Sequence, residues 1–129
     1  MKTCTPEHAA LCRQKADVII EPLRARAREL GYALGVHGSL ARDIDLIAVP
    51  WTDDAVPARE LAEALLEKAV AVNGLAWMHP LEAANEWHQN GCQPHGKPHG
   101  RHCWSFHLGG GPYIDLSVMP RLVAGTTLT

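Results

Sequence analysis

Apolar residues change their spacing along the chain from helical to strand-like and back, which predicts a mixed α/β fold. Residues 6–30 follow a Thr5-Pro6-Glu7 helix start and carry apolar residues at helical spacing. Pro22 lies inside this pattern, so we predict either one kinked helix or two short helices ending before Gly31. The stripe expected to face the core is Ala9, Cys12, Ala16, Ile19, Leu23, Ala27 and Leu30.

Two strands and a second helix are predicted next. Tyr32–His37 is short, apolar and bounded by glycine, and it leads into a Gly38-Ser39 turn. Asp43–Val49 is rich in branched residues and reads as a second strand, followed by a loop at 50–57. From Pro57 to the Asn73-Gly74 stop, apolar and charged residues alternate at helical spacing. The apolar face of this helix is Leu61, Leu65, Leu66, Ala69 and Val72.

The second half of the chain ends in a predicted hairpin. Two strand-like runs, His102–Leu108 and Tyr113–Met119, are joined by three glycines and a proline. Before them we expect a short strand at Leu75–Met78, a helix at Pro80–Asn90, and an exposed loop rich in Gly, Pro and His at Cys92–Arg101. The tail from Arg121 to Thr129 has little pattern.

These elements predict one α/β (α+β) domain over residues 1–129, with a mixed sheet of about four strands and helices packed on one face. A 47% hydrophobic chain of 129 residues suits a single core. The formal net charge of −2 does not indicate nucleic acid as a partner. Absence of a long apolar run argues against a membrane partner, and four sparse cysteines are expected as free thiols in a cytoplasmic protein.

Three aspartates in strand-like settings are the strongest chemical signal. Asp43 and Asp45 alternate in an otherwise apolar strand, so both carboxylates should point to one sheet face. Asp115 has a similar setting in Ile114-Asp115-Leu116. Carboxylates at close range repel one another unless a cation compensates them, and hard oxygen ligands suit Mg²⁺ or Mn²⁺. We therefore expect Asp43, Asp45 and Asp115 to bind a divalent metal.

The run from His37 to Leu46, His-Gly-Ser-Leu-Ala-Arg-Asp-Ile-Asp-Leu, resembles the nucleotidyltransferase superfamily typified by DNA polymerase beta and kanamycin nucleotidyltransferase. The resemblance covers 32–51 and 104–120. The short length and the Pro98–Arg101 segment are also similar to small phage nucleotidyltransferase-like proteins. Such proteins transfer a nucleoside monophosphate from an NTP to a hydroxyl acceptor.

The resemblance implies a role for each matched residue. Asp43 and Asp45 would hold both metals, and Asp115 would hold the catalytic metal and help to activate the acceptor hydroxyl. Gly38 and Ser39 would meet the triphosphate. Only three residues separate Ser39 from Asp43, fewer than the family usually has, so fewer backbone donors face an anion. Arg42 would either replace those donors by pairing with phosphate or form an ion pair with Asp43 or Asp45.

Two further functions remain open from the sequence. One is a catalytically inactive protein of this fold that binds a nucleotide or a protein partner, motivated by the shortened turn. The other is a zinc-stabilised binding module, because five potential ligands crowd a short segment, although their spacing matches no standard finger. Those residues are Cys92, His95, His99, His102 and Cys103.

The sequence leaves open what the four tryptophans do and what the acceptor is. Tryptophan can stack on a nucleobase, but in a small domain it lies more often in the core or an interface. The four are Trp51, Trp77, Trp87 and Trp104. We expect no second domain to grip an acceptor, so an isolated monomer would have an open site, and the sequence leaves an oligomer open. The sequence does not identify the acceptor or the NTP.

Overall fold

The computed structural model describes residues 5–78 and 102–121. The predicted helix at 80–90, the loop at 92–101 and the tail beyond Arg121 lie outside the described residues. The described elements are α1 (Pro6–Glu29), β1 (Tyr32–His37), β2 (Ile44–Pro50), α2 (Ala58–Asn73), β3 (Trp77–Met78), β4 (His102–His107) and β5 (Tyr113–Val118).

The strands form one mixed five-stranded sheet in the order β1-β2-β5-β4-β3. The two central strands, β2 and β5, are parallel, whereas the other neighbouring pairs are antiparallel. The predicted hairpin is present as β4 and β5. The sheet has one strand more than the four expected, because the short β3 pairs with the edge of β4.

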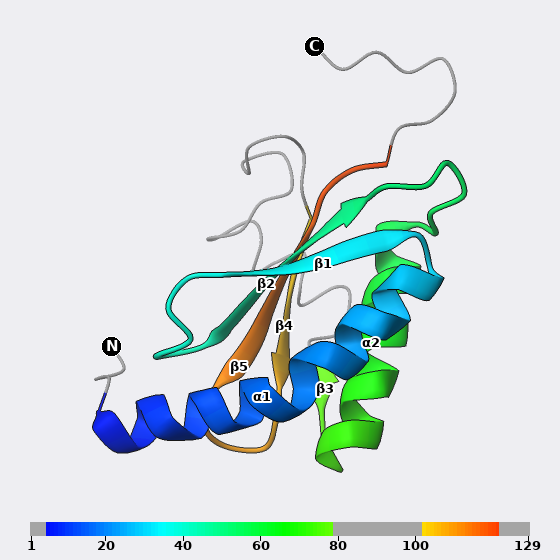
Figure 1. The fold of residues 1–129 in the computed structure, drawn as a ribbon. Helices are drawn as coiled ribbons and strands as arrows, with labels where there is room; N and C mark the ends of the chain where they lie inside the picture. The colour runs from blue at the N-terminus through cyan, green and yellow to red at the C-terminus, as the bar shows by residue number, and fades with distance from the viewer. Residues whose placement is uncertain (1–4, 79–101, 122–129) are drawn as a thin grey trace.

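Strand alternation divides the sheet into an apolar face and a polar face. Alternate residues of β2 and β5 are fully buried in one core together with residues of both helices. The helices α1 and α2 therefore cover the same face of the sheet, as predicted (Figure 1). The strand residues in this core include Leu34, Ile44, Leu46, Ala48, Phe106, Ile114, Leu116 and Val118.

Helix α1 is one continuous helix through Pro22, so the prediction of two short helices is wrong. Ile19 and Leu23 are buried on either side of Pro22, and this burial offsets the backbone hydrogen bond that proline removes. The predicted start is confirmed, since Thr5 Oγ1 accepts a hydrogen bond from the backbone N–H of His8 at 3.0 Å.

Helix α2 ends at the predicted place, where Gly74 adopts a left-handed φ of 84°. Asn73 joins this end to the rest of the molecule: its amide donates to the carbonyl of Leu108 at 3.0 Å, and its side-chain oxygen accepts from Lys15 Nζ at 2.6 Å. These bonds connect α2 to α1 and to the end of β4. Within the described ranges, neither helix has the length and apolar character needed to span a bilayer.

Candidate active site

A row of polar side chains crosses the face of the sheet opposite the helices. Asp45 on β2 is the register partner of His37 on β1 and of Asp115 on β5, and Asp115 is in turn the partner of Ser105 on β4. Because register partners project from the same face, four strands contribute one row, His37, Asp45, Asp115 and Ser105. We call these four residues the carboxylate row.

Hydrogen bonds fix both aspartates of the carboxylate row. Ser105 Oγ donates to Asp115 Oδ1 at 2.7 Å. Asp45 and Asp115 share a side-chain hydrogen bond that favours a proton on Asp115. This interaction, which needs a proton on one of the two groups, lowers the pKa of Asp45 and raises that of Asp115.

The pKa values of both carboxyl groups are raised above the ordinary value. Burial is the largest cause for Asp115, and the negative charges of Asp43 and Asp45 raise its pKa further, while the Ser105 hydroxyl opposes them. Burial also raises the pKa of Asp45; His37 lowers it and Asp43 raises it. The three aspartates are therefore close enough to repel one another.

Asp43 lies one residue before β2, not within the strand as predicted. Its Oδ1 accepts a hydrogen bond at 3.0 Å from the backbone N–H of Tyr113, the first residue of β5. This bond starts the parallel pairing of β2 and β5 and holds the Asp43 carboxylate at the same end of the sheet as the carboxylate row. The three predicted aspartates thus converge, although Asp43 stands apart from the other two.

In the described residues, no group of three or more His, Cys, Asp or Glu side chains is arranged to hold a metal ion. Asp43 accepts a hydrogen bond from the Tyr113 N–H, and Asp115 accepts one from Ser105. The three aspartates supply hard carboxylate oxygens, which are the ligand type that Mg²⁺ or Mn²⁺ prefers. The three carboxyl groups therefore offer the ligand type of a divalent ion, but as they lie they do not form a three-ligand group.

The Gly38-Ser39 turn lies directly against Asp45. Gly38 has a φ of 84°, and a Cβ at this position would stand 3.0 Å from Asp45 Oδ2. Leu40 also has a positive φ, 58°, so the short turn contains two left-handed residues. Ser39 Oγ accepts from the N–H of Ala41 at 3.3 Å. The turn leaves Gly38 and Ser39 exposed to solvent beside the carboxylate row.

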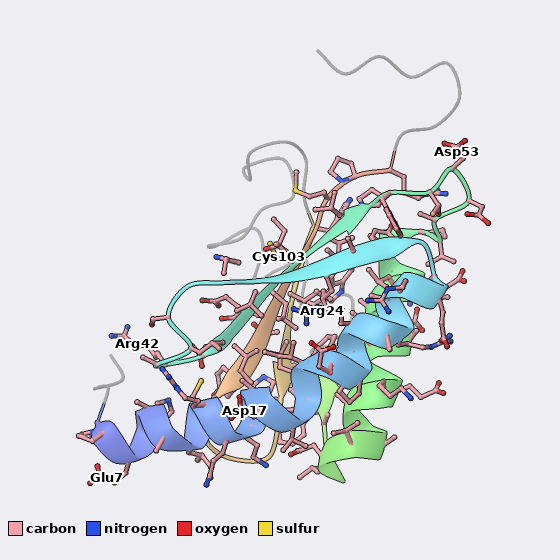
Figure 2. The ribbon with its side chains drawn as sticks, in the orientation of Figure 1. Glu7, Asp17, Arg24, Arg42, Asp53 and Cys103 are labelled. Carbon is pink, nitrogen blue, oxygen red and sulfur yellow. The ribbon has the colours of Figure 1, made fainter. Side chains whose placement is uncertain are left out.

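Arg42 is exposed and points away from the sheet in the connection between β1 and β2 (Figure 2). Of the two roles considered for it, an ion pair with Asp43 or Asp45 does not occur among the described residues. Its carbonyl oxygen accepts a hydrogen bond from His8 Nε2 at 2.7 Å, which anchors the turn to the first turn of α1. The guanidinium is therefore accessible to an anion from solvent.

Most of the predicted His/Cys cluster lies outside the described residues; His102 and Cys103 begin β4. Successive strand residues point to opposite faces, and His102 is exposed while Cys103 is buried 3.6 Å from Ser117 Oγ. These two residues are therefore poorly placed to bind one zinc ion together.

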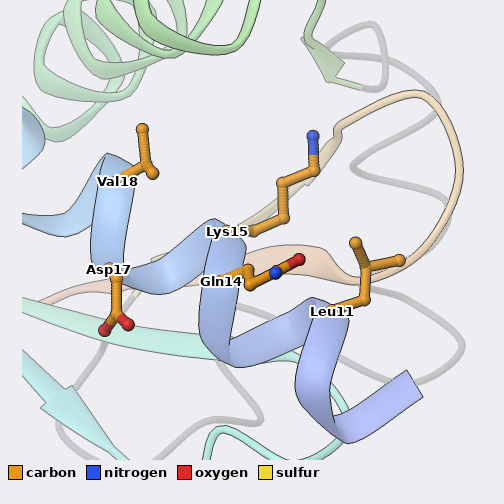
Figure 3. Close-up of a pocket in the computed structure, with 5 residues that line it drawn as sticks. All are labelled: Leu11, Gln14, Lys15, Asp17 and Val18. Carbon is orange, nitrogen blue, oxygen red and sulfur yellow. The ribbon is translucent and has the colours of Figure 1, made fainter. Parts of the chain in front are cut away.

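Two hollows in the described part of the molecule bear on the site. One, of about 460 Å³, runs along α1 between Leu11 and Val18 (Figure 3), far from the sheet's polar face. The other, of about 360 Å³, lies at the end of the sheet where Asp43 meets Tyr113. Only the second is beside the aspartates.

Ser105 and Tyr113 were not singled out from the sequence. Alternation within the predicted strand after residue 101 places Ser105 between buried Trp104 and Phe106, and hence on the polar face. What the sequence does not give is the register of β4 against β5, which puts Ser105 beside Asp115.

No family model, curated protein or solved structure matches this chain.

Proposed function

We propose that the protein is a metal-dependent nucleotidyltransferase that moves a nucleoside monophosphate from an NTP to a hydroxyl acceptor. The observation that carries the proposal is the pairing of Asp45 with Asp115 on adjacent parallel strands, with Gly38 against Asp45. Burial and the negative charges of neighbouring aspartates raise the pKa of both carboxyl groups, so a divalent cation would be a favourable partner for this pair.

The chain's own residues have distinct roles in this proposal. Asp45 and Asp115 would hold Mg²⁺ or Mn²⁺, with Asp43 adding a third negative charge. Such ions neutralise phosphate charge and favour in-line displacement. The exposed Gly38-Ser39 turn and the Arg42 guanidinium would bind the phosphates, the first through backbone N–H groups and the second through paired N–H donors.

The covalent step balances with these groups alone. The acceptor oxygen forms a bond to the α-phosphorus, and the bond from that phosphorus to the oxygen bridging to the β-phosphate breaks. The electron pair leaves with pyrophosphate, and the acceptor's proton passes to Asp115, which must first be in its carboxylate form. Ser105 donates to Asp115 Oδ1 and so holds the carboxylate that takes the proton.

The test is transfer of an α-labelled nucleotide in Mg²⁺ or Mn²⁺, using the four ribonucleotides and hydroxyl acceptors of three kinds: nucleosides, RNA 3′ ends and protein side chains. We expect transfer by the wild type and a loss of at least about 100-fold in Asp45→Asn and Asp115→Asn, because each removes several kcal/mol of charge stabilisation. Asp53→Asn, in the exposed loop after β2, is the matched control (Figure 2). Transfer undiminished in Asp115→Asn would refute the mechanism.

A second candidate is a catalytically inactive protein that binds a nucleotide. Its supporting observation is the hydrogen bond that Asp45 and Asp115 share in place of a three-ligand metal group among the described residues. It predicts NTP binding that does not depend on a divalent ion, and no transfer of label to any acceptor.

A further inference from the structure

Three aromatic rings form a second row on the polar face of the sheet. Trp77 on β3, His107 on β4 and Tyr113 on β5 are successive register partners. The Trp77 and His107 rings are stacked, with centroids 5.2 Å apart and planes inclined by 8°. The His107 and Tyr113 centroids are 4.5 Å apart. Tyr113 and Asp115 share a face of β5, so the rings and the carboxylate row lie on the same side.

These rings line the hollow of about 360 Å³ at the end of the sheet. The first turn of α1 and the turn between β4 and β5 close its other sides, and Figure 1 shows that turn passing below α1. The turn contributes glycines, whose lack of side chains keeps the space open. The lining residues are His8, Trp77, His107, Gly110, Gly111 and Tyr113.

Two hydrogen bonds join this hollow, which we call the aromatic groove, to the candidate active site. The Tyr113 N–H donates to Asp43 Oδ1 at 3.0 Å, and His8 Nε2 donates to the Arg42 carbonyl at 2.7 Å. The groove lies on the β5, β4 and β3 side of the aspartates, whereas Gly38 and Ser39 lie on the β1 side. The carboxylates therefore stand between the exposed turn and the aromatic groove.

Cross-strand packing alone gives one use for the rings, because a stacked pair helps to hold a two-residue strand at the sheet edge. That use does not require Trp77 to remain open to solvent, yet 46% of it is exposed. It also does not require histidines on two sides of a hollow. Aromatic faces with nearby ring nitrogens suit a planar nitrogen heterocycle, since a base stacks on such a face whatever its sequence identity.

We infer that the aromatic groove binds the base of a nucleoside acceptor, whose hydroxyl then reaches Asp115. The inference rests on the proposed function and adds the chemical class of the acceptor to it. The acceptor, not the NTP, is assigned to the groove because the groove is on the Asp115 side. Asp115 takes the acceptor's proton, and the phosphate-binding turn is on the Asp45 side.

The test is calorimetric titration of the full chain with adenosine, guanosine, cytidine and uridine, without divalent ions. We expect at least one nucleoside to bind at up to millimolar concentration. Trp77→Ala should weaken that binding by about 5- to 150-fold, the range that loss of one stacked base gives. Trp77→Phe should keep most of it. Trp51→Ala is the matched control, because Trp51 is also exposed but follows the opposite end of β2.

Three outcomes would overturn the inference: no nucleoside binding, equal binding by Trp77→Ala, or loss in Trp77→Ala of NTP binding with nucleoside binding unchanged.

Asp115→Asn separates the two proposals. It should bind the nucleoside like the wild type and fail to transfer label to it. Transfer to other acceptors without nucleoside binding would refute the groove and leave the proposed function intact. Nucleoside binding by the wild type without transfer of label to any acceptor would refute the proposed function and leave only base binding by the groove.

Discussion

At the scale of single residues, the decisive fact is that Asp45 and Asp115 are register partners on one face of the sheet. Burial and the negative charges of the neighbouring aspartates disfavour their ionised forms, so the folded protein binds protons there more tightly than the unfolded chain does. Burial raises the pKa of each above the ordinary 3.8. The fold therefore keeps two carboxyl groups that repel each other side by side, although packing of the sheet does not need them. Such pairs are typical of functional sites.

The raised pKa values make the stability of the metal-free protein depend on pH. The folded state binds more protons than the unfolded state from pH 3.8 up through the raised pKa values, so the free energy of unfolding falls as pH rises through that window. We expect Asp45→Asn to be more stable than the wild type at pH 7, since its amide can donate to Asp115. The advantage should shrink as pH is lowered toward 3.8.

Urea unfolding of both proteins in chelator across that pH range measures this difference. Asp53→Asn, in the exposed loop, controls for the loss of one negative charge anywhere on the molecule. A wild type that is more stable than Asp45→Asn at pH 7, or a difference independent of pH, would contradict the assigned repulsion.

At the scale of elements, the connection from β1 to β2 decides what faces Asp45. Residues 38–43 span it with left-handed conformations at Gly38 and Leu40, and His8 of α1 anchors its far side through the Arg42 carbonyl. The turn is therefore held by the helix as well as by the strands. A glycine at its start lets the backbone approach the Asp45 carboxylate.

Gly38→Ala and Gly74→Ala separate backbone strain from contact with the site. Both glycines have a φ of 84°, so each variant should lose roughly 1–2 kcal/mol of stability. Only at Gly38 does the new Cβ stand 3.0 Å from Asp45 Oδ2, whereas nothing lies within 4 Å at Gly74. Calorimetry should therefore show weaker Mn²⁺ binding in Gly38→Ala alone. Equal Mn²⁺ affinity in the two variants would mean that the turn plays no part in the metal site.

At the scale of the whole molecule, one core fixes the positions of all the site residues. Both helices cover the apolar face, and their buried residues join Leu46, Leu116 and Phe106 in a single cluster. The polar face then carries the carboxylate row and, at its end, the aromatic groove. A ligand that binds this face should stabilise the entire domain, because unfolding destroys the site together with the core.

Thermal unfolding with Mn²⁺ tests this coupling. At a concentration 100 times its dissociation constant, Mn²⁺ should stabilise the wild type by about 2.7 kcal/mol. The double variant Asp45→Asn, Asp115→Asn should gain nothing comparable, whereas Asp53→Asn should behave like the wild type. A similar gain in the double variant would place the binding elsewhere on the chain.

Local pattern determined the elements. The Thr5-Pro6 start, the Gly74 stop and the glycine run of the hairpin all predicted element ends within a residue or so, because capping and turn chemistry depends on neighbours in sequence. Strand alternation likewise indicated that the aspartates avoid the core. The α+β class and the helices on one face followed from these local rules.

Only the tertiary structure decided which side chains meet. Register between strands distant in sequence placed Asp115 beside Asp45 and Ser105 beside Asp115, and it brought Trp77 onto His107. Register depends on packing across the whole core, not on any local pattern. The sequence by itself therefore determined that this chain carries aspartates on a sheet, and the fold decided that they form one site with an aromatic groove at its end.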